Sequence, residues 1–305
     1  MSGPAATRAG DAGTGAPARW LVTGAAGMLG RDLQALLART PDVTVTGLDR
    51  AELDIVDAGA VADAVAGYDV VVNTAAYTAV DAAETDERAA LAVNGHGARN
   101  VAAACAKAGA TLVHISTDYV FAGDATEPYP EDAPAGPRSA YGRSKWAGER
   151  GVAELLPDRG YVVRTAWLYG EHGSNFVRTV ARLAGERERL NVVADQHGQP
   201  TWSRDLARGL VTLVTARPPA GVYHCVSGGS TTWYGLARAV FEELGLDPDR
   251  VRPTTSDRFA RPAPRPEFSV LATARWEAAG LPPMPDWRAA LHTAFAAWGH
   301  TLRAR

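Results

Sequence analysis

Lysine is nearly absent from this sequence, although lysine and arginine together number 31 among its 305 residues. Only Lys107 and Lys145 are present. Cysteine is equally scarce, and Cys105 and Cys225 are too few for the disulfide framework of a small secreted protein. No segment is apolar over enough residues to act as a signal peptide or to span a membrane. We therefore expect a cytoplasmic protein without a membrane partner.

An excess of charge of one sign is also missing, because 31 basic and 34 acidic residues give a formal net charge of -3 at pH 7. The sequence therefore lacks the basic character of a protein that binds nucleic acid. Its seven histidines show no spacing typical of metal ligands. His114 lies in an apolar run, where a packed side chain is expected, so we predict no metal site. Residues 1–18 are rich in alanine, glycine, proline and threonine, and we expect a disordered tail there.

Short apolar runs alternate with helical patterns up to residue 165. The predicted strands lie at 19–23, 43–48, 69–73, 110–115 and 161–165. The predicted helices lie between them, at 27–39, 57–66, 85–108 and 141–156. Repeated strands and helices of this kind build a parallel sheet. The predicted fold class is therefore α/β, a Rossmann-type doubly wound parallel sheet.

The first predicted strand leads directly into a turn with glycine at Gly24, Gly27 and Gly30, and a helical pattern follows the turn. Glycine lets the backbone approach a pyrophosphate, whose charge is met by free N–H groups at the helix N-terminus. The second predicted strand ends in Asp49, at the spacing where a carboxylate holds the adenosine ribose of a dinucleotide. This context predicts a dinucleotide site rather than a plain structural turn.

The sequence leaves both NADH and NADPH open as cofactors. The Asp49 carboxylate would repel the 2′-phosphate of NADPH, whereas the adjacent Arg50 could pair with it. We expect Asp54 and Ile55 beneath the adenine, and small residues after the third strand would let the cofactor pass close to the strand end. The expected cofactor-binding residues are Gly24, Gly27, Met28, Leu29, Gly30, Asp49, Arg50, Asp54, Ile55, Ala75, Ala76, Tyr77, Tyr141 and Lys145.

The strand and helix pattern becomes looser after Tyr169. Further elements are predicted as helices at 175–187, 203–216, 232–245 and 286–299 and as strands at 190–193 and 222–225. We expect a dinucleotide-binding domain at 19–170, to which 202–225 returns. Residues 171–201 and 226–305 would form a smaller, discontinuous C-terminal lobe. Such a lobe would cover the carboxyl ends of the strands, where ligands of open α/β sheets bind.

Lys145 follows Tyr141 by four residues within a predicted helix, so the two side chains share one face. A tyrosine hydroxyl has an ordinary pKa of about 10, and a neighbouring ammonium lowers this pKa by stabilising the phenolate. A pair placed in this way can exchange a proton with a reacting carbonyl. Chance spacing is the alternative for the pair alone. Together with the glycine turn, the pair indicates nicotinamide-dependent carbonyl reduction.

Four motifs together resemble those of the extended short-chain dehydrogenase/reductases. They are the glycine turn, Asn94-x-x-Gly97-x-x-Asn100, the strand end Ser116-Thr117-Asp118, and Tyr141-x-x-x-Lys145. More narrowly, the chain is similar to the dTDP-4-dehydrorhamnose reductase family in segments 75–81, 164–170, 175–176, 196–201 and 265–271. The resemblance implies reduction of the 4-keto group of a dTDP-4-dehydro-6-deoxyhexose by NADPH or NADH. The most direct case is dTDP-4-dehydro-L-rhamnose, which would become dTDP-L-rhamnose.

The resemblance also implies a role for each site residue. Thr117 would hydrogen-bond the sugar ketone, Tyr141 would protonate its oxygen, and Lys145 would lower the tyrosine pKa and hold the nicotinamide ribose. Neighbouring side chains of a strand face opposite ways, so Ser116 is the alternative to Thr117 if the register differs by one residue. The implied substrate-binding residues are Thr117, Asp118 and Trp167 near the sugar or its phosphates, and Gln196, Thr201 and Arg265 in the nucleotide pocket. Trp167 as a core residue and Arg265 as a surface charge are the alternatives.

Some members of the resembled family are associated with Mg²⁺ at a dimer contact, so the resemblance allows a homodimer and a Mg²⁺ ion. Four other functions remain open on the same fold. A 4,6-dehydratase would need an acid where this chain has Tyr119. A ketoreductase of another deoxysugar, such as the dihydrostreptose type, is open because Glu267 and Phe268 depart from the family pattern. An epimerase would keep its cofactor bound through turnover, and a catalytically silent regulatory subunit would not need Tyr141 and Lys145.

Overall fold

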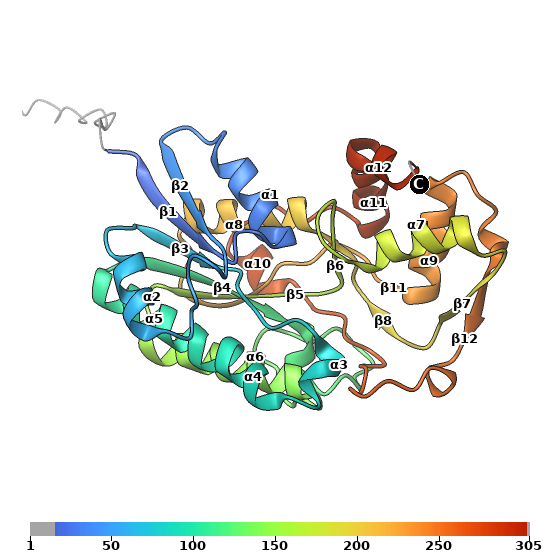
Figure 1. The fold of residues 1–305 in the computed structure, drawn as a ribbon, viewed down its shortest axis with the longest axis horizontal. Helices are drawn as coiled ribbons and strands as arrows, with labels where there is room; N and C mark the ends of the chain where they lie inside the picture. Colours follow the sequence, from blue (N-terminus) through green and yellow to red (C-terminus); the bar gives the residue numbers. More distant parts are fainter. Residues whose placement is uncertain (1–15, 304–305) are drawn as a thin grey trace, which may run out of the picture.

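The computed structural model describes residues 16–303. Of the expected tail, residues 1–15 lie outside the described residues, and Ala18 is already the first residue of strand β1 (Ala18–Thr23). Figure 1 shows a larger part, which contains the central sheet in blue and green, beside a smaller part drawn mainly in yellow, orange and red.

Six parallel strands form the central sheet, in the order β10-β5-β4-β3-β1-β2. Besides β1 they are β2 (Val43–Leu48), β3 (Val70–Asn73), β4 (Thr111–Thr117), β5 (Gly160–Thr165) and β10 (Gly221–His224). The predicted fold class is therefore confirmed. The chain passes from β1 to β2 on one side and then to β3 on the other, so the strand order reverses between β1 and β3. Ligands of open α/β sheets bind at such a point.

Alternate side chains of each strand supply two hydrophobic cores, one on each face of the sheet. In β1, Trp20 and Val22 pack with helices α1 (Met28–Leu37) and α8 (Ser203–Ala216). Leu21 points the other way and packs with α2 (Ala58–Val65), α5 (Ala98–Ala108) and α6 (Ala140–Leu155). Figure 1 shows these helices covering the two faces. Burial on both faces explains the nearly continuous apolar runs of the inner strands β1, β3 and β5, whereas the edge strand β2 alternates valine with threonine.

The helix expected at 85–108 is interrupted. Helix α4 (Glu87–Leu91) continues into wider π-helical turns at Ala92–Gly97 before α5 begins. A short helix that the sequence analysis did not expect, α3 (Val80–Ala83), precedes α4. Helix α4 packs through Ala90 against Ala83 and Ala140, whereas α5 packs through Val101 in the core under β1 and β3. Hydrophobic periodicity gave no sign of the π-helical turns between them.

The smaller part is built from short paired strands and the last helices. Parallel pairs are β6 (Leu168–Tyr169) with β9 (Thr201–Trp202) and β7 (Leu190–Val193) with β12 (Val251–Thr254), while β8 (His197–Gly198) and β11 (Thr231–Thr232) are antiparallel. Its helices are α7 (Phe176–Glu186), α9 (Trp233–Glu243), α11 (Trp287–Trp298) and α12 (His300–Arg303). Helix α10 (Ala274–Ala278) departs from the expected division, because Trp276 and Leu281 pack in the core of β1, α1 and α8.

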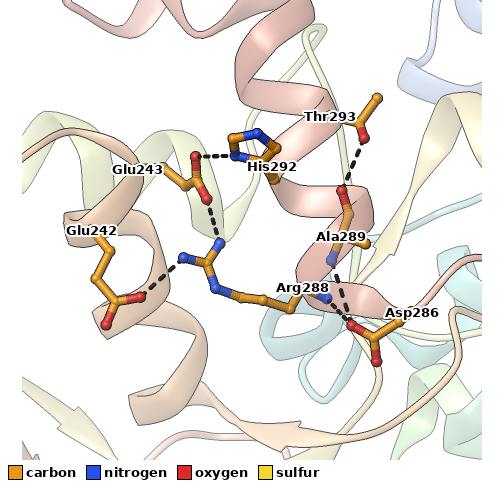
Figure 2. Close-up of polar contacts among 7 residues, drawn as sticks. All are labelled: Glu242, Glu243, Asp286, Arg288, Ala289, His292 and Thr293. Atoms are coloured by element: carbon orange, nitrogen blue, oxygen red, sulfur yellow. Dashed lines mark hydrogen bonds and ion pairs between the residues drawn. The ribbon is translucent and has the colours of Figure 1, made fainter.

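A polar cluster joins α11 to α9 in this smaller part (Figure 2). The Arg288 guanidinium of α11 lies 2.9 Å from the Glu242 carboxylate and also contacts Glu243, both on α9. One turn further along α11, His292 Nδ1 lies 3.1 Å from Glu243 Oε2. The Asp286 carboxylate accepts the backbone N–H of Arg288 at 2.9 Å and so caps α11. Because Arg288 and Glu242 are both partly exposed, we expect their ion pair to contribute at most ~1 kcal/mol.

Candidate active site

A crevice of about 760 Å³ lies at the carboxyl ends of β1, β3 and β4, where the strand order reverses. Its lining extends from Asp49 and Arg50, past the glycine turn, to Trp167 and Trp233. Its volume is within the range of small-molecule sites, roughly 300–1,000 Å³. The lining includes all the residues expected to bind the cofactor, and also Thr117, Asp118 and Trp167.

Glycine is required at two positions of the turn after β1. Gly24 has a φ of +70°, and a Cβ there would lie 2.6 Å from the backbone nitrogen of Ala75. A Cβ at Gly30 would lie 2.6 Å from the Gly24 carbonyl oxygen. The N-terminus of α1 has no side-chain cap and no acidic residue in its first turn. Its N–H groups can therefore meet the charge of a pyrophosphate, and the turn fits a dinucleotide.

Strand β2 is followed by a carboxylate that has hydrogen-bond partners and by a guanidinium that has none among residues 16–303. Oδ1 of Asp49 accepts the backbone N–H of Ala51 at 2.8 Å and that of Glu52 at 3.3 Å. Arg50 is exposed and makes no hydrogen bond or ion pair with any residue in the range 16–303. The carboxylate is therefore engaged within its own turn, whereas the guanidinium is free to bind an anion at this end of the crevice.

Asn94, in the π-helical turns, fixes the loop that follows β3. Its Oδ1 accepts the Tyr77 N–H at 2.8 Å, and its Nδ2 donates to the Tyr77 carbonyl at 3.0 Å. The same amide donates to the Ser144 hydroxyl of α6 at 2.9 Å. Asn94 therefore holds Ala75, Ala76 and Tyr77 along the crevice. The sequence motif contained Asn94, but its spacing alone could not indicate this contact.

Tyr141 and Lys145 both line the crevice from α6, as their spacing predicted. The helix begins where it does because the Ser139 hydroxyl accepts the Gly142 N–H at 3.1 Å, which places Tyr141 in the first turn. Lys145 is buried, and its Nζ donates to the Ile115 carbonyl of β4 at 2.6 Å. An ammonium has three N–H groups, so this contact uses one of the three.

Thr117 and Asp118 lie beside Tyr141 at the end of β4. The Thr117 hydroxyl donates to Asp118 Oδ1 at 2.9 Å, and it is also close enough to Tyr141 to affect the tyrosine pKa. The neighbouring Ser116 hydroxyl instead donates to Glu149 Oε1, at 2.5 Å, in the interior. Of the two hydroxyls, the one of Thr117 therefore lies with the tyrosine.

One oxygen of the Asp118 carboxylate has no partner. Asp118 is 2% exposed, and its Oδ2 forms no hydrogen bond of good geometry within residues 16–303, although the Ser269 hydroxyl is close enough to lower the pKa of the carboxyl. Nearly all buried polar atoms of folded proteins are hydrogen-bonded. Since Asp118 also lines the crevice, the unpaired oxygen fits a donor on a bound ligand.

Burial is the largest cause of the pKa shifts of Tyr141, Asp118 and Lys145. The pKa of Tyr141 is raised to about 12, first by burial and then by the charge of Asp118, with the Thr117 hydrogen bond opposing both effects. Burial also raises the pKa of Asp118 to about 6. It lowers the pKa of Lys145 to about 8, against the opposing charge of Glu149. At neutral pH the tyrosine is therefore a protonated acid and the lysine is mostly an ammonium, and lowering of the tyrosine pKa by Lys145 stays a prediction.

Two tryptophans stand at the far end of the crevice. Trp167 stacks face to face on Trp233, with ring centroids 3.5 Å apart, and Phe176 contacts the Trp233 ring at 4.6 Å. Trp167 follows β5, whereas Trp233 is the first residue of α9. The smaller part therefore contributes to the crevice through Trp233. Sequence reasoning missed this residue, because a single aromatic at a helix start gives no signal of a site.

Three of the expected substrate-binding residues lie outside the lining of the crevice. Gln196 Nε2 donates to the Ser256 hydroxyl at 2.8 Å, and Thr201 is fully buried. Arg265 forms an ion pair of 2.9 Å with Asp81 of the short helix α3. The binding roles of Gln196, Thr201 and Arg265 stay predictions.

The described residues 16–303 contain no evident metal site and no membrane-spanning helix. No group of three histidine, cysteine, aspartate or glutamate side chains in this range could hold a metal ion. None of the helices in the same range is both long and apolar enough to cross a membrane.

Comparisons with known proteins match this geometry. The chain is 56% identical over 285 residues to a dTDP-4-dehydrorhamnose reductase of Streptomyces griseus, with 92% of this chain and 93% of the relative covered. It is 52% identical over 279 residues to a dTDP-4-keto-6-deoxy-D-glucose reductase of Streptomyces niveus, with 91% and 96% covered. A solved dTDP-4-dehydrorhamnose reductase of Bacillus anthracis, in complex with NADP, has a TM-score of 0.88 at 38% identity, with 92% and 99% covered.

The family match extends over both parts of the molecule. A sequence model with the description RmlD substrate binding domain matches residues 18–299, from the first residue of β1 to one residue past the end of α11. The resemblance seen in the sequence motifs is thereby confirmed. The chain belongs to the RmlD substrate-binding domain family.

Proposed function

We propose that this protein is an NADPH- or NADH-dependent oxidoreductase that reduces the 4-keto group of a dTDP-4-dehydro-6-deoxyhexose. The proposed reaction converts dTDP-4-dehydro-L-rhamnose to dTDP-L-rhamnose. One observation carries the proposal: Thr117, Tyr141 and Lys145 line the same crevice as the glycine turn, beside the unpaired oxygen of Asp118. The names of the relatives support the class of substrate.

The bound nicotinamide would supply the hydride, and the side chains of this chain would handle the proton and the charge. Tyr141 would give its proton to the ketone oxygen, because it is protonated at neutral pH. The Thr117 hydroxyl has one proton, which Asp118 accepts here, and this proton would turn to the ketone oxygen when the sugar binds. The Lys145 ammonium would then stabilise the phenolate that the proton transfer leaves.

The larger part of the molecule would bind the cofactor, and the smaller part would bind the sugar. Residues 19–170, together with 202–225, would hold the cofactor against the glycine turn. The lobe would cover the sugar, and the contribution of Trp233 to the crevice supports this division. A free Arg50 beside a locally bound Asp49 favours NADPH over NADH, because a guanidinium can pair with the 2′-phosphate.

The geometry also bears on the alternative functions. Tyr119 occupies the position where a 4,6-dehydratase would need an acid, and burial raises the pKa of its hydroxyl far above neutrality. Asp118 lines an open crevice and keeps one buried oxygen without a hydrogen-bond partner. A silent regulatory subunit would not need such an oxygen. The Streptomyces niveus relative favours a second candidate substrate, dTDP-4-keto-6-deoxy-D-glucose.

The proposal is tested by mixing the purified protein with NADPH or NADH and a panel of nucleotide 4-ketosugars. Oxidation of the cofactor with dTDP-4-dehydro-L-rhamnose, and a dTDP-L-rhamnose product, is the expected result. Faster oxidation with dTDP-4-keto-6-deoxy-D-glucose would select the second candidate. Nicotinamide absorbance that stays with the protein through turnover would indicate an epimerase. No oxidation with any ketosugar would refute the proposal.

A further inference from the structure

A buried charged network lies behind the strand end that carries Thr117. Arg164 of β5 binds the Glu149 carboxylate of α6 through Nε at 3.0 Å and Nη2 at 2.7 Å. The Ser116 hydroxyl of β4 donates to the same carboxylate at 2.5 Å, and Arg164 Nη1 donates to the Glu131 carbonyl at 3.1 Å. Glu149 and Arg164 are each only 2% exposed. The network therefore joins α6, β4 and β5 at one point in the interior.

Stability alone does not explain why these charges are here. Transfer of both charges out of water opposes their mutual attraction, and an apolar pair of similar volume is often as stable or more stable. The Ser116 hydroxyl and the Glu131 carbonyl satisfy the remaining polar atoms of the pair, so the network is complete. A complete charged network beside the strand end of Thr117 points to an electrostatic role in the site.

The network is connected to the lysine of the crevice in two ways. Tyr141, Lys145 and Glu149 follow one another at intervals of four residues along α6, so they share one face. Ser116 also follows Ile115, whose carbonyl accepts the Lys145 ammonium, and precedes Thr117. Glu149 therefore fixes the strand end that both Lys145 and Thr117 depend on.

We propose that Glu149 is a positioning residue: held by Arg164 and Ser116, it fixes the end of β4 and supplies the negative charge that keeps Lys145 an ammonium. Glu149 touches neither the crevice nor the reacting atoms and acts through Lys145. This inference rests on the proposed function, in which the Lys145 ammonium stabilises the phenolate of Tyr141.

The other groups around Lys145 do not supply this negative charge. Burial and the charge of Lys145 itself lower the pKa of His114 on β4, so this imidazole is neutral. Burial lowers the pKa of His224, which lies 3.4 Å from Arg164, to about 3, so it is neutral as well. Tyr141 is protonated. Glu149 is the anion that raises the pKa of Lys145 against the effect of burial.

The charged groups farther from Lys145 act on other residues or lie at the surface. Asp118 acts on the pKa of Tyr141. Where α4 and α5 pack on α6, the charged groups form exposed ion pairs, Arg143 with Glu87 and Arg99 with Glu154. The exposed Glu154 pair provides a control on the same helix.

The scarcity of lysine makes a direct test practical. In protein labelled with a carbon isotope at lysine Cε, NMR gives two signals, one from Lys145 and one from the exposed Lys107 of α5. The signal of Lys145 should titrate with a pKa of about 8 in the wild type. In Glu149→Gln we expect it to titrate at least about one pH unit lower, since unit charges ~6 Å apart interact strongly at an effective dielectric constant of ~20.

The same change should appear in the kinetics. The ammonium is lost as the pH rises through the lysine pKa, so the alkaline decline of kcat/KM should move to lower pH by the same amount in Glu149→Gln. Glu149→Asp, which keeps the charge, should shift less than Glu149→Gln. Glu154→Gln should leave both the titration and the pH profile unchanged.

Glu149→Gln leaves the Arg164 guanidinium buried without a counter-charge, so the same substitution is also made in an Arg164→Met background, and the double variant is compared with Arg164→Met alone. A lysine titration that does not change when Glu149 is replaced in either background, with kcat/KM lowered by one factor at every pH, would overturn the proposal. Failure of both variants to fold would also overturn it, because the network would then serve the fold. A wild type without reductase activity would refute the proposed function, while the lysine titration would still decide the electrostatic role of Glu149.

Discussion

Replacement of Asp118 by asparagine is expected to stabilise the fold and to lower activity. Asp118 is buried, its Oδ1 accepts the Thr117 hydroxyl, and its Oδ2 has no partner in the described part of the chain. Burial raises the pKa of this carboxyl from 3.8 to about 6. Asparagine keeps the shape and the Oδ1 acceptor but carries no charge. It therefore resembles the protonated carboxyl.

The magnitude follows from the two pKa values. Each pH unit between them corresponds to about 1.4 kcal/mol, so the ionised carboxylate destabilises the fold by about 3 kcal/mol. The folded state holds the proton more tightly than the unfolded state does. This destabilisation is therefore absent below about pH 4, grows between about pH 4 and pH 6, and is complete above that range. Asp118→Asn should gain about 3 kcal/mol at about pH 8 and almost nothing near pH 4.

Urea unfolding of the wild type and of Asp118→Asn at the two pH values measures this difference through the transition midpoint. The same variant should lose at least about tenfold in kcat/KM with the 4-ketosugar, because a ligand donor loses its charged acceptor. A variant less stable than the wild type at about pH 8 would refute the reasoning. An equal gain at both pH values would also refute it, since the effect would then not come from the charge.

Three further variants test other parts of the site. Tyr141→Phe should keep cofactor affinity but lose at least about 10²-fold in turnover, as expected for a lost general acid, and near-normal steady-state turnover would mean that the proton comes from elsewhere. Arg50→Ala should raise the KM for NADPH about tenfold, because one charge-assisted contact with the 2′-phosphate is lost. The KM for NADH should not change. Equal effects on both cofactors would contradict the role assigned to Arg50. Gly24→Ala should lower the midpoint of thermal unfolding and abolish cofactor binding, as measured by calorimetry, because the new Cβ would lie 2.6 Å from the Ala75 nitrogen. Unimpaired binding would show that the turn does not hold the cofactor.

The sheet and the cofactor end of the crevice were predictable from sequence because their determinants are local. Each buried strand is an apolar run, and the glycine turn follows β1 directly in the chain. The i, i+4 spacing of Tyr141 and Lys145 was enough to bring both side chains to one crevice. Sequence left the choice between Ser116 and Thr117 open, since it depends on strand register, and the contact of Ser116 with Glu149 distinguishes the two hydroxyls.

The sugar end was less predictable because distant contacts build it. Strands β8 and β11 have two residues each and pair across more than thirty positions of sequence. No periodic pattern in the sequence predicts strands this short. Trp233 reaches the crevice only because α9 packs beside Trp167. The ion pair that Arg265 forms with Asp81 joins residues far apart in the chain, and no local motif contains both partners.

The central claim is that the crevice holds a nicotinamide and a sugar ketone beside Tyr141. The most direct test uses NADPH deuterated at the transferable position of its C4, with dTDP-4-dehydro-L-rhamnose as substrate. NMR of the product should show deuterium at C4 of the sugar, and Tyr141→Phe should form this product at least about 10²-fold more slowly. A reduced sugar without deuterium at C4, or no reduced sugar at all, would contradict the account.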